Sequence, residues 1–332
     1  MRLAASWPGL RTHRSGSTIS AFSRSGAHIH MFAIIGALVV LGAIIGGYLM
    51  EHGNLMVLLQ PAELIIIGGA AAGTVLIANP LPRVVRIAKG AMGVLKASPY
   101  TKAFYLDYLK MMYELFQYAR KYGAVKLEND IEDPFKSELF KKYPKFLADH
   151  HALYFVCDTL RTFVSGGVSP FELDQLMEMD MEVHHAETNA PVAALSTVAD
   201  SLPGLGIVAA VLGVCITMGA IGGPPEEIGH KVASALVGTF LGILLCYGFF
   251  GPLASNMAGA NEGEAQLYHC LRVGIAAFVR GAAPVLSVEF ARRVIPPEVR
   301  PTFQEAEKYC KQRTEAAPEA VAAGAPAAAT AG

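Results

Sequence analysis

The stretch PGLGIVAAVLGVCITMGAIGG, residues 203–223, constrains the fold more strongly than any other part of the chain. A helix needs ~20 apolar residues to cross the ~30 Å hydrocarbon core of a bilayer, and this stretch is long enough and has no charged side chain. Its only hydrogen-bonding side chains are the hydroxyl of Thr217 and, weakly, the thiol of Cys215. Such a segment is either a membrane anchor or the wall of an ion path whose ion-binding group lies on another chain.

Three further stretches are similarly apolar: residues 31–50, 54–80 and 232–261. Only Glu63 is charged within them, and the last is long enough to span with tilt or to emerge as a continuing helix. Charged residues make up 17% of the chain, against about a quarter in soluble domains, and the deficit is concentrated in these stretches. The sequence therefore predicts four transmembrane helices.

Short connections at residues 51–53 and 224–231 join these helices into two hairpins with both turns on the same side. Of the 27 Lys and Arg residues, 26 lie outside the two turns, and Lys231 is the exception. Because basic residues remain in the cytoplasm, we expect both termini and the long middle segment to be cytoplasmic.

The middle segment is predicted to be helical throughout. Residues 98–123 place apolar side chains at helical spacing and end on Gly123, and helical character resumes from Pro134 to Gly166. Ser169, followed by Pro170 and Glu172, forms a capping box that opens another helix. No part alternates with period two, so we expect an all-α integral membrane protein with four transmembrane helices and a large helical cytoplasmic loop.

These patterns divide the chain into six parts: an N-terminal extension (1–30), a first transmembrane hairpin (31–80), a cytoplasmic helical domain (81–200), a second hairpin (201–260), a cytoplasmic C-terminal helical segment (261–315) and a disordered Ala/Pro-rich tail (316–332). The extension is basic and Ser/Gly-rich, as in a transit-like segment. Because Met31 opens the first apolar stretch directly, we interpret the extension instead as a wrongly assigned start.

Catalytic, metal and cofactor sites are not indicated. The five cysteines form no CxxC pair, and the ten histidines form no HExxH motif. The pairs His150–His151 and His184–His185 lie in charged, helix-like surroundings typical of a solvated surface. A net charge of −1 gives no reason to expect nucleic-acid binding. We predict that the chain is not an enzyme.

A proton path through a membrane is normally marked by an intramembrane carboxylate, and the third and fourth stretches have none. Glu63 follows Gln60 and Pro61 near the outer end of the second stretch. We favour a structural role for it, at the interface or at a neighbouring helix end, over a role in conduction. If the chain conducts ions, a partner supplies the charge-bearing group.

Small residues recur at helix-packing intervals. For the pairs Gly42–Gly46 and Gly69–Gly73 we predict packing among the chain's own helices. The third and fourth stretches carry similar faces, which also bear Thr217 and Thr239 and suit a surface that grips a foreign helix; their members are Gly206, Ala210, Gly213, Ala235, Gly242 and Cys246.

Two prolines and two charges have roles that the residues alone leave open. Pro203 and Pro252 lie near the cytoplasmic ends of the third and fourth stretches, where plain helix termination explains them. Arg120 and Glu128 flank Gly123, and charges at such a corner are usually solvated and contribute little.

Several motifs, in order, resemble the MotA family of flagellar motor stator subunits from about residue 31 to about residue 303. They are QPAELIIIGGAAAG, LENDIEDPFKSELFKKYP, DSLPGLGIVAAVLGV, ALVGTFLGILLCYGFFGPLA and APVLSVEFARR. The resemblance implies a pentameric ring around a MotB dimer, whose single span carries the ion-binding aspartate. The second hairpin is then the pore wall.

The same resemblance implies roles for single residues. Pro203 and Pro252 match the prolines that couple ion passage to conformational change, and Arg120 and Glu128 match the charged pair that engages the rotor protein FliG. Sodium-type relatives carry a threonine where this chain has Ala210, whereas Thr239 is common to both types, so we expect protons.

Two alternative functions can be set against this one. An ExbB/TolQ-like energiser of a periplasmic effector uses related pore helices, but such proteins typically have three spans and lack the first hairpin and the LENDIEDP segment. A secondary transporter or a scaffold acting alone is the other alternative, and the internal repeats typical of such transporters are absent from this sequence.

Overall fold

The computed structural model describes residues 29–93, 98–219 and 221–312, and these residues form helices and connecting turns without any strand. The tail at residues 316–332 lies outside the described residues, as does the predicted extension except for its last two residues. In chain order the helices are α1 Ile29–Met50, α2 Leu55–Leu58, α3 Pro61–Ala78, α4 Leu81–Gly93, α5 Lys102–Tyr122, α6 Ala124–Glu132, η1 Phe140–Lys142, α7 Pro144–Ala148, α8 His150–Ser165, α9 Pro170–Met218, α10 Pro225–Leu244, η2 Leu245–Phe250, α11 Gly251–Val279, α12 Pro284–Val294 and α13 Phe303–Lys311.

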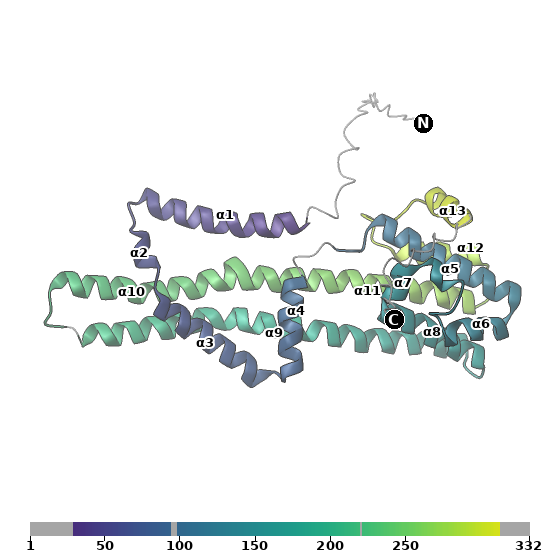
Figure 1. Cartoon of the computed structure of the whole chain (residues 1–332), viewed down its shortest axis with the longest axis horizontal. Helices are drawn as coiled ribbons and strands as arrows, with labels where there is room; N and C mark the ends of the chain where they lie inside the picture. Colours follow the sequence, from purple (N-terminus) through teal and green to yellow (C-terminus); the bar gives the residue numbers. More distant parts are fainter. Residues whose placement is uncertain (1–28, 94–97, 220, 313–332) are drawn as a thin grey trace, which may run out of the picture.

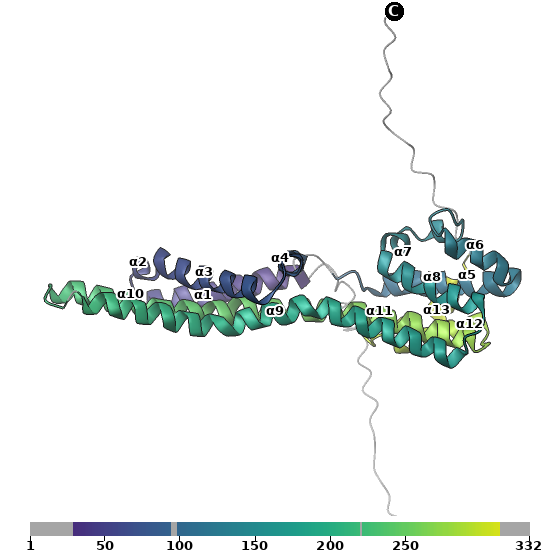
Figure 2. The same ribbon diagram turned by 90° about the horizontal axis from the view of Figure 1, so that it is seen from below.

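The molecule is a long two-helix stalk with a helical bundle at one end (Figure 1). Helix α9 runs beside α10 along one half of the stalk and beside α11 along the other. Seen from below, α3 and α4 lie on one side of the layer that α9 and α10 form (Figure 2). Four helical segments of the described chain are long and apolar enough to cross a membrane, which confirms the all-α prediction with four spans.

Helix α9 extends through 49 residues, so the predicted boundary at residue 200 falls inside it. The predicted capping box is confirmed: Ser169 Oγ accepts from the Glu172 N–H at 3.2 Å, and Glu172 Oε2 accepts from the Ser169 N–H at 2.8 Å. Pro203 lies within this helix and does not end it. The predicted boundary at residue 260 likewise falls inside α11.

Two predicted elements differ at their ends. The second apolar stretch is broken at Gln60 because Pro61, with no N–H to donate, occupies the first position of α3. The turn predicted at residues 224–231 is shorter, since α10 begins at Pro225 with two glutamates in its first turn. From that point the chain remains helical through η2 into α11, as the alternative of a continuing helix predicted.

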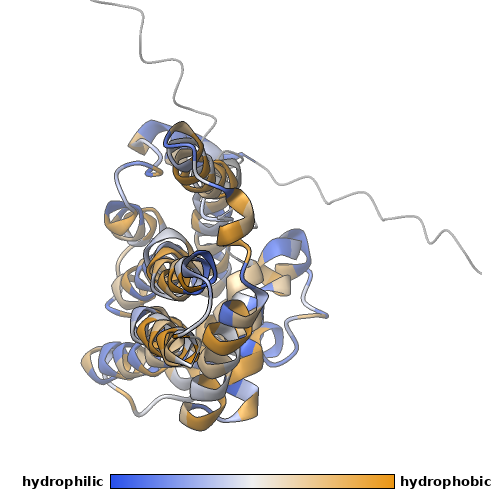
Figure 3. Cartoon of the chain, turned by 90° about the vertical axis from the view of Figure 1, so that its left-hand side faces the viewer, coloured by the Kyte–Doolittle hydropathy of each residue, from blue (hydrophilic) through white to orange (hydrophobic). Residues whose placement is uncertain are grey.

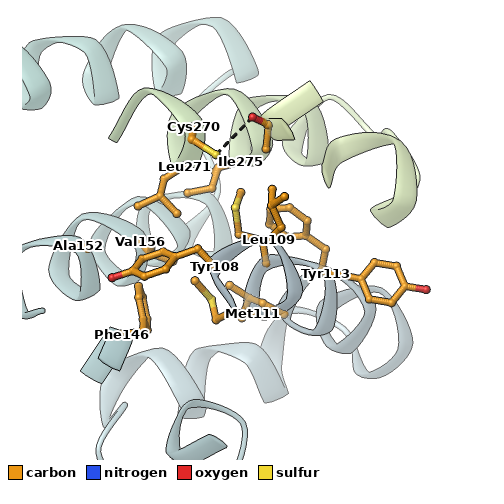
Figure 4. Close-up of a cluster of buried hydrophobic side chains, with 14 of the residues drawn as sticks. Tyr108, Leu109, Met111, Tyr113, Phe146, Ala152, Val156, Cys270, Leu271 and Ile275 are labelled. Carbon is orange, nitrogen blue, oxygen red and sulfur yellow. Dashed lines mark hydrogen bonds between the residues drawn. The ribbon is translucent and has the colours of Figure 1, made fainter. Parts of the chain in front are cut away.

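The helical bundle has the largest of the three hydrophobic cores among the described residues (Figure 4). Tyr108 and Met111 of α5 face Val156 of α8 and Leu271 of α11, and all four are almost completely buried. The helix predicted from Pro134 to Gly166 is instead divided into η1, α7 and α8. It is divided because Pro144 starts α7, and the Asp149 carboxylate accepts the Ala152 N–H at 3.1 Å to start α8.

Candidate functional site

Helices α9 and α10 approach so closely that their backbones touch. A methyl group added at Gly206 would lie 2.8 Å from the Gly238 carbonyl oxygen and 3.0 Å from the Gly242 Cα. One added at Gly213 would lie 2.7 Å from the Ala235 Cβ. We call this contact, formed by Gly206, Ala209, Gly213, Ala235, Gly238 and Gly242, the α9–α10 seam. Only glycine and alanine fit along it.

The seam reverses the sequence prediction about small residues. The small faces of the third and fourth stretches pack against each other, so they are not free to grip a foreign helix. At Gly42, Gly46, Gly69 and Gly73 an added methyl would meet no atom within 4 Å among the described residues. The prediction that these four glycines pack within the chain is therefore wrong. The spacing of small residues shows that they share one face of a helix, but it does not show which other helix packs against that face.

The predicted pathway residues lie at or beside the seam. The Ala210 amide nitrogen would be 3.1 Å from a methyl at Gly238, whose neighbour in the chain is the half-buried Thr239. Thr217 is buried, and its hydroxyl donates to the Gly213 carbonyl at 2.8 Å. The structure thus brings Ala210 and Thr239 to one level of the helix pair, with Thr217 two turns beyond Ala210 on α9.

Glu63 is the functional candidate that the sequence pattern placed incorrectly. Its side chain is not at an interface: the residue is 7% exposed and its carboxylate lies in the α9–α10 seam. A methyl on Gly238 would lie 2.7 Å from Glu63 Oε2, and one on Gly213 would lie 3.7 Å from Oε1. Oε2 has no hydrogen-bond partner among the described residues. The signal in the sequence was a single charge inside an apolar run.

The two predicted coupling prolines are on neighbouring segments of the stalk. Pro203 is half-buried in α9, next to Leu202, whose carbonyl oxygen would be 2.5 Å from a methyl at Gly242. Pro252 is exposed in the first turn of α11, directly after the π-helical turn η2. Wider turns of this kind interrupt the regular hydrogen-bond ladder, and no sequence pattern predicted this one.

Arg120 and Glu128 are on the surface at the far end of the bundle from the seam. Arg120 lies in the last turn of α5 and Glu128 in α6, and both are exposed. Gly123, with φ +80°, both ends α5 and starts α6, a backbone conformation that disfavours other residues. Neither charge has an ion-pair or hydrogen-bond partner in the described part of the chain, so both are available at this corner, where Lys121 and Lys126 are exposed as well.

Charged groups join α9 to α11 at the bundle end of the stalk, outside the apolar stretches. Arg272 Nε donates to Asp174 Oδ1 at 2.8 Å, and Arg280 donates to Oδ2 of the same carboxylate at 3.2 Å. Farther along α9 toward the apolar stretch, His184 Nε2 lies 3.0 Å from Glu264 Oε1. This hydrogen bond raises the pKa of His184 above its ordinary value, although partial burial opposes it.

No group of three or more His, Cys, Asp or Glu side chains that could hold a metal ion occurs among the residues the structure describes. In the end view, hydrophobic residues colour much of the helices that face the viewer (Figure 3). The spanning parts of α9 and α10, residues 201–218 and 232–244, therefore carry no charged side chain and enclose the Glu63 carboxyl, and α9 continues into the bundle that has the exposed charged corner.

Comparison with known proteins points to one family. The profile described as "Motility protein A N-terminal" matches residues 34–123, and that of the "MotA/TolQ/ExbB proton channel family" matches residues 146–269. Motility protein A of Escherichia coli strain K12 is 42% identical over 265 residues, which cover 80% of this chain and 90% of that protein. Chemotaxis protein LafT of Vibrio parahaemolyticus is 36% identical, with coverage of 80% and 94%.

Two solved structures have the same fold. One, described as the structure of C. jejuni MotAB, has a TM-score of 0.65 at 18% identity and covers 81% of this chain and 98% of its own. The other, the flagellar MotAB stator complex from Bacillus subtilis, has a TM-score of 0.63 at 23% identity, with coverage of 79% and 95%.

Proposed function

Because the chain belongs to the motility protein A family, within the MotA/TolQ/ExbB proton channels, we propose that it is a stator subunit of the bacterial flagellar motor. The observation that carries this proposal is the α9–α10 pair, whose spanning parts carry no charged side chain and which the continuous helix α9 joins to the bundle that bears the exposed charged corner. A wall without its own ion-binding group at its surface needs a partner that brings one.

The protein is a multi-pass membrane protein, and its basic residues support an orientation in the inner membrane with both termini in the cytoplasm. In that orientation the turn between α9 and α10 faces the periplasm. The bundle and the α9–α11 part of the stalk are then cytoplasmic.

MotB is the proposed partner, since the solved structures that share this fold are described as MotAB complexes. A dimer of that partner, surrounded by five copies of this chain, would place its ion-binding aspartate against the walls. The outward faces of α9 and α10 suit this contact because they carry large apolar side chains in the open; these include Ile207, Val208, Val211, Leu236 and Ile243.

The proposed cycle begins when a proton from the periplasm neutralises the partner's aspartate, which allows that carboxyl to lie against the apolar wall. Release of the proton to the cytoplasm restores the charge and drives the carboxylate away. Each charge that crosses is worth ~2.3 kcal/mol per 100 mV, several times RT, so one proton can bias one step of rotation.

Three features couple this cycle to the rotor. Pro203 interrupts the backbone ladder of α9, and Pro252 follows the wide turn η2, so both helices can bend at the inner end of the wall. Arg120 and Glu128, at the exposed corner, are proposed to pair with charges on FliG. Such pairs set the register of a transient contact more than its strength.

Protons, and not sodium ions, are the proposed coupling ion. At Ala210 the wall offers a methyl group where a hydroxyl could replace part of the hydration shell of a metal ion. The Thr217 hydroxyl already donates within α9. Thr239, at the level of Ala210, does not distinguish a proton path from a sodium path.

The test is rotation of tethered cells that lack their own stator and receive this chain with its cognate partner in sodium-free medium. We expect rotation that stops when a protonophore is added. Rotation that requires added sodium would contradict the proton assignment. Absence of rotation in both media, with both chains in the membrane, would instead favour an ExbB/TolQ-like energiser.

A further inference from the structure

Glu63 is the only Asp, Glu, Lys or Arg in the membrane-spanning parts of α1, α2, α3, α9 and α10, taken as residues 33–50, 55–78, 201–218 and 232–244. It is not at the lipid surface, because it is 7% exposed, and its carboxylate enters the α9–α10 seam between Gly213 and Gly238. The close approach is possible only because those two positions have no side chain.

The charge state of this carboxyl follows from its surroundings. Ionised carboxylates are buried at very high cost unless they are paired, and Glu63 Oε2 has no partner among the described residues. The facing segments of α9 and α10 contribute no charged side chain, and Cys215 is their only other titratable group. Outside them, Lys231 is paired with Glu227 beside His230, and the basic residues of α4 lie at the opposite end of α3. The neutral, protonated carboxyl is therefore the stable form in this position.

The depth of Glu63 connects it to the ion path. Gly238 is six residues beyond Val232, where the uncharged part of α10 begins, which places it about 9 Å inside the span from the periplasmic end. The same Gly238 is in contact with Ala210, one of the predicted pathway residues. The carboxyl thus reaches the α9–α10 pair from the side of α3. It does so at the level of Ala210, where the outward faces of α9 and α10 are expected to meet the partner's carboxylate.

We propose that Glu63 is a proton-binding site of this chain within the ion path, a role that rests on the proposed stator function. The protonated carboxyl gives its proton inward to the partner's carboxylate, and the costly carboxylate form that this leaves at Glu63 is transient. A proton from the periplasm then restores the neutral form. One O–H bond breaks and one forms at Glu63 in each cycle, and the net result is one proton moved inward.

A purely structural carboxyl makes a different prediction. If Glu63 only fills the space beside Gly213 and Gly238, the isosteric glutamine fills it equally well and can also hydrogen-bond. If Glu63 exchanges protons, glutamine abolishes the exchange at every pH, whereas aspartate retains a titratable group in a shifted position. The pair Glu63→Gln and Glu63→Asp therefore separates the two roles.

The experiment uses the full chain with its cognate partner in cells that lack their own stator, and records tethered-cell rotation against external pH. Glu51→Gln is the matched control, because Glu51 is an exposed carboxyl in the turn that precedes α2. We expect Glu51→Gln to rotate like wild type. Glu63→Gln should lose about tenfold or more in speed at every pH, although it still co-purifies with the partner. Glu63→Asp should rotate with a displaced pH profile.

A second measurement follows the proton directly. Infrared difference spectra of the purified wild-type complex, recorded across a pH titration, should contain a protonated-carboxyl C=O band that Glu63→Gln lacks and Glu63→Asp shifts. Wild-type speed in Glu63→Gln, loss of partner binding in both variants, or a band unchanged by substitution would each overturn the inference. Failure of the wild-type chain to rotate would instead overturn the stator function itself.

Discussion

Asp174 connects α9 to α11 through two arginines. Its carboxylate is 23% exposed and accepts from Arg272 at 2.8 Å and from Arg280 at 3.2 Å. Replacing it with alanine leaves both guanidinium groups without this acceptor, which costs about 1–3 kcal/mol. We expect Asp174→Ala to lower the melting temperature of the purified complex by about 2–8 °C. Asp158→Ala is the control, because it removes only an exposed local ion pair with Arg161 and should change the melting temperature little. An equal fall in both variants would contradict the stabilising role of Asp174.

His184 should make the stalk sensitive to pH. Its folded-state pKa is raised by the hydrogen bond with Glu264, so the contact contributes fully below the unfolded value of about 6.5. That contribution is lost as the pH rises through the raised pKa. We expect the wild-type melting temperature to fall more than that of His184→Gln between about pH 6 and about pH 8.5. The exposed neighbour His185, changed to glutamine, should leave the wild-type slope intact, and parallel slopes in all three proteins would refute the prediction.

At the scale of elements, the sequence predicted the helix starts and stops that depend on neighbouring residues. The capping box at Ser169 and the glycine stop at Gly123 were predictable because each depends on residues within one turn. The continuation of α9 across Pro203 was not, because a proline costs a helix about 3 kcal/mol and the packing of α9 against the neighbouring helices overrides that cost. Glu63 was conspicuous in the sequence, but its partner helices are more than a hundred residues away.

The seam predicts a sharp contrast between two glycines. A methyl at Gly242 would lie 2.5 Å from the Leu202 carbonyl oxygen, a backbone atom that cannot move aside alone. At Gly204, only two residues from Leu202, an added methyl meets nothing within 4 Å among the described residues. We expect Gly242→Ala to separate α9 from α10 and abolish rotation and partner binding, and Gly204→Ala to retain both. Co-purification of the partner with each variant is the measurement, and normal binding by Gly242→Ala would disprove the packing argument.

Replacing Pro203 with alanine is expected to change stability and function in opposite directions. Alanine restores the missing backbone donor and removes the ring's clash within α9, so the helix gains up to about 3 kcal/mol. If α9 must bend there in each cycle, the straighter helix should transmit less motion. We expect Pro203→Ala to raise the melting temperature of the complex and to stop or greatly slow tethered-cell rotation. A more stable variant that rotates normally would show that the bend is not needed.

At the scale of the whole molecule, α1 is attached by one face only. Its half-buried side chains recur on one side of the helix, and a methyl at Gly248 of η2 would lie 3.2 Å from Val40 on that side. With 3.6 residues per turn, Gly42 lies on roughly the opposite side, toward the open. Gly69 and Gly73 on α3 are open as well. The sequence could not show this, because whether a glycine face is covered depends on the packing of the whole chain.

These open glycine faces are where we expect neighbouring copies of the chain to pack. Small residues let membrane helices approach closely, and in lipid such packing takes the place of the hydrophobic effect between helices. Leucine at Gly46 and Gly73 should therefore reduce the number of chains per purified complex, measured by native mass spectrometry, while the helical bundle melts as before. Gly36→Leu is the matched control, because Gly36 is also open but lies about 100° around α1 from the Gly42–Gly46 face. Five chains per complex in the double variant would mean that the copies meet elsewhere, because a leucine on the contacting face would hold the helices apart.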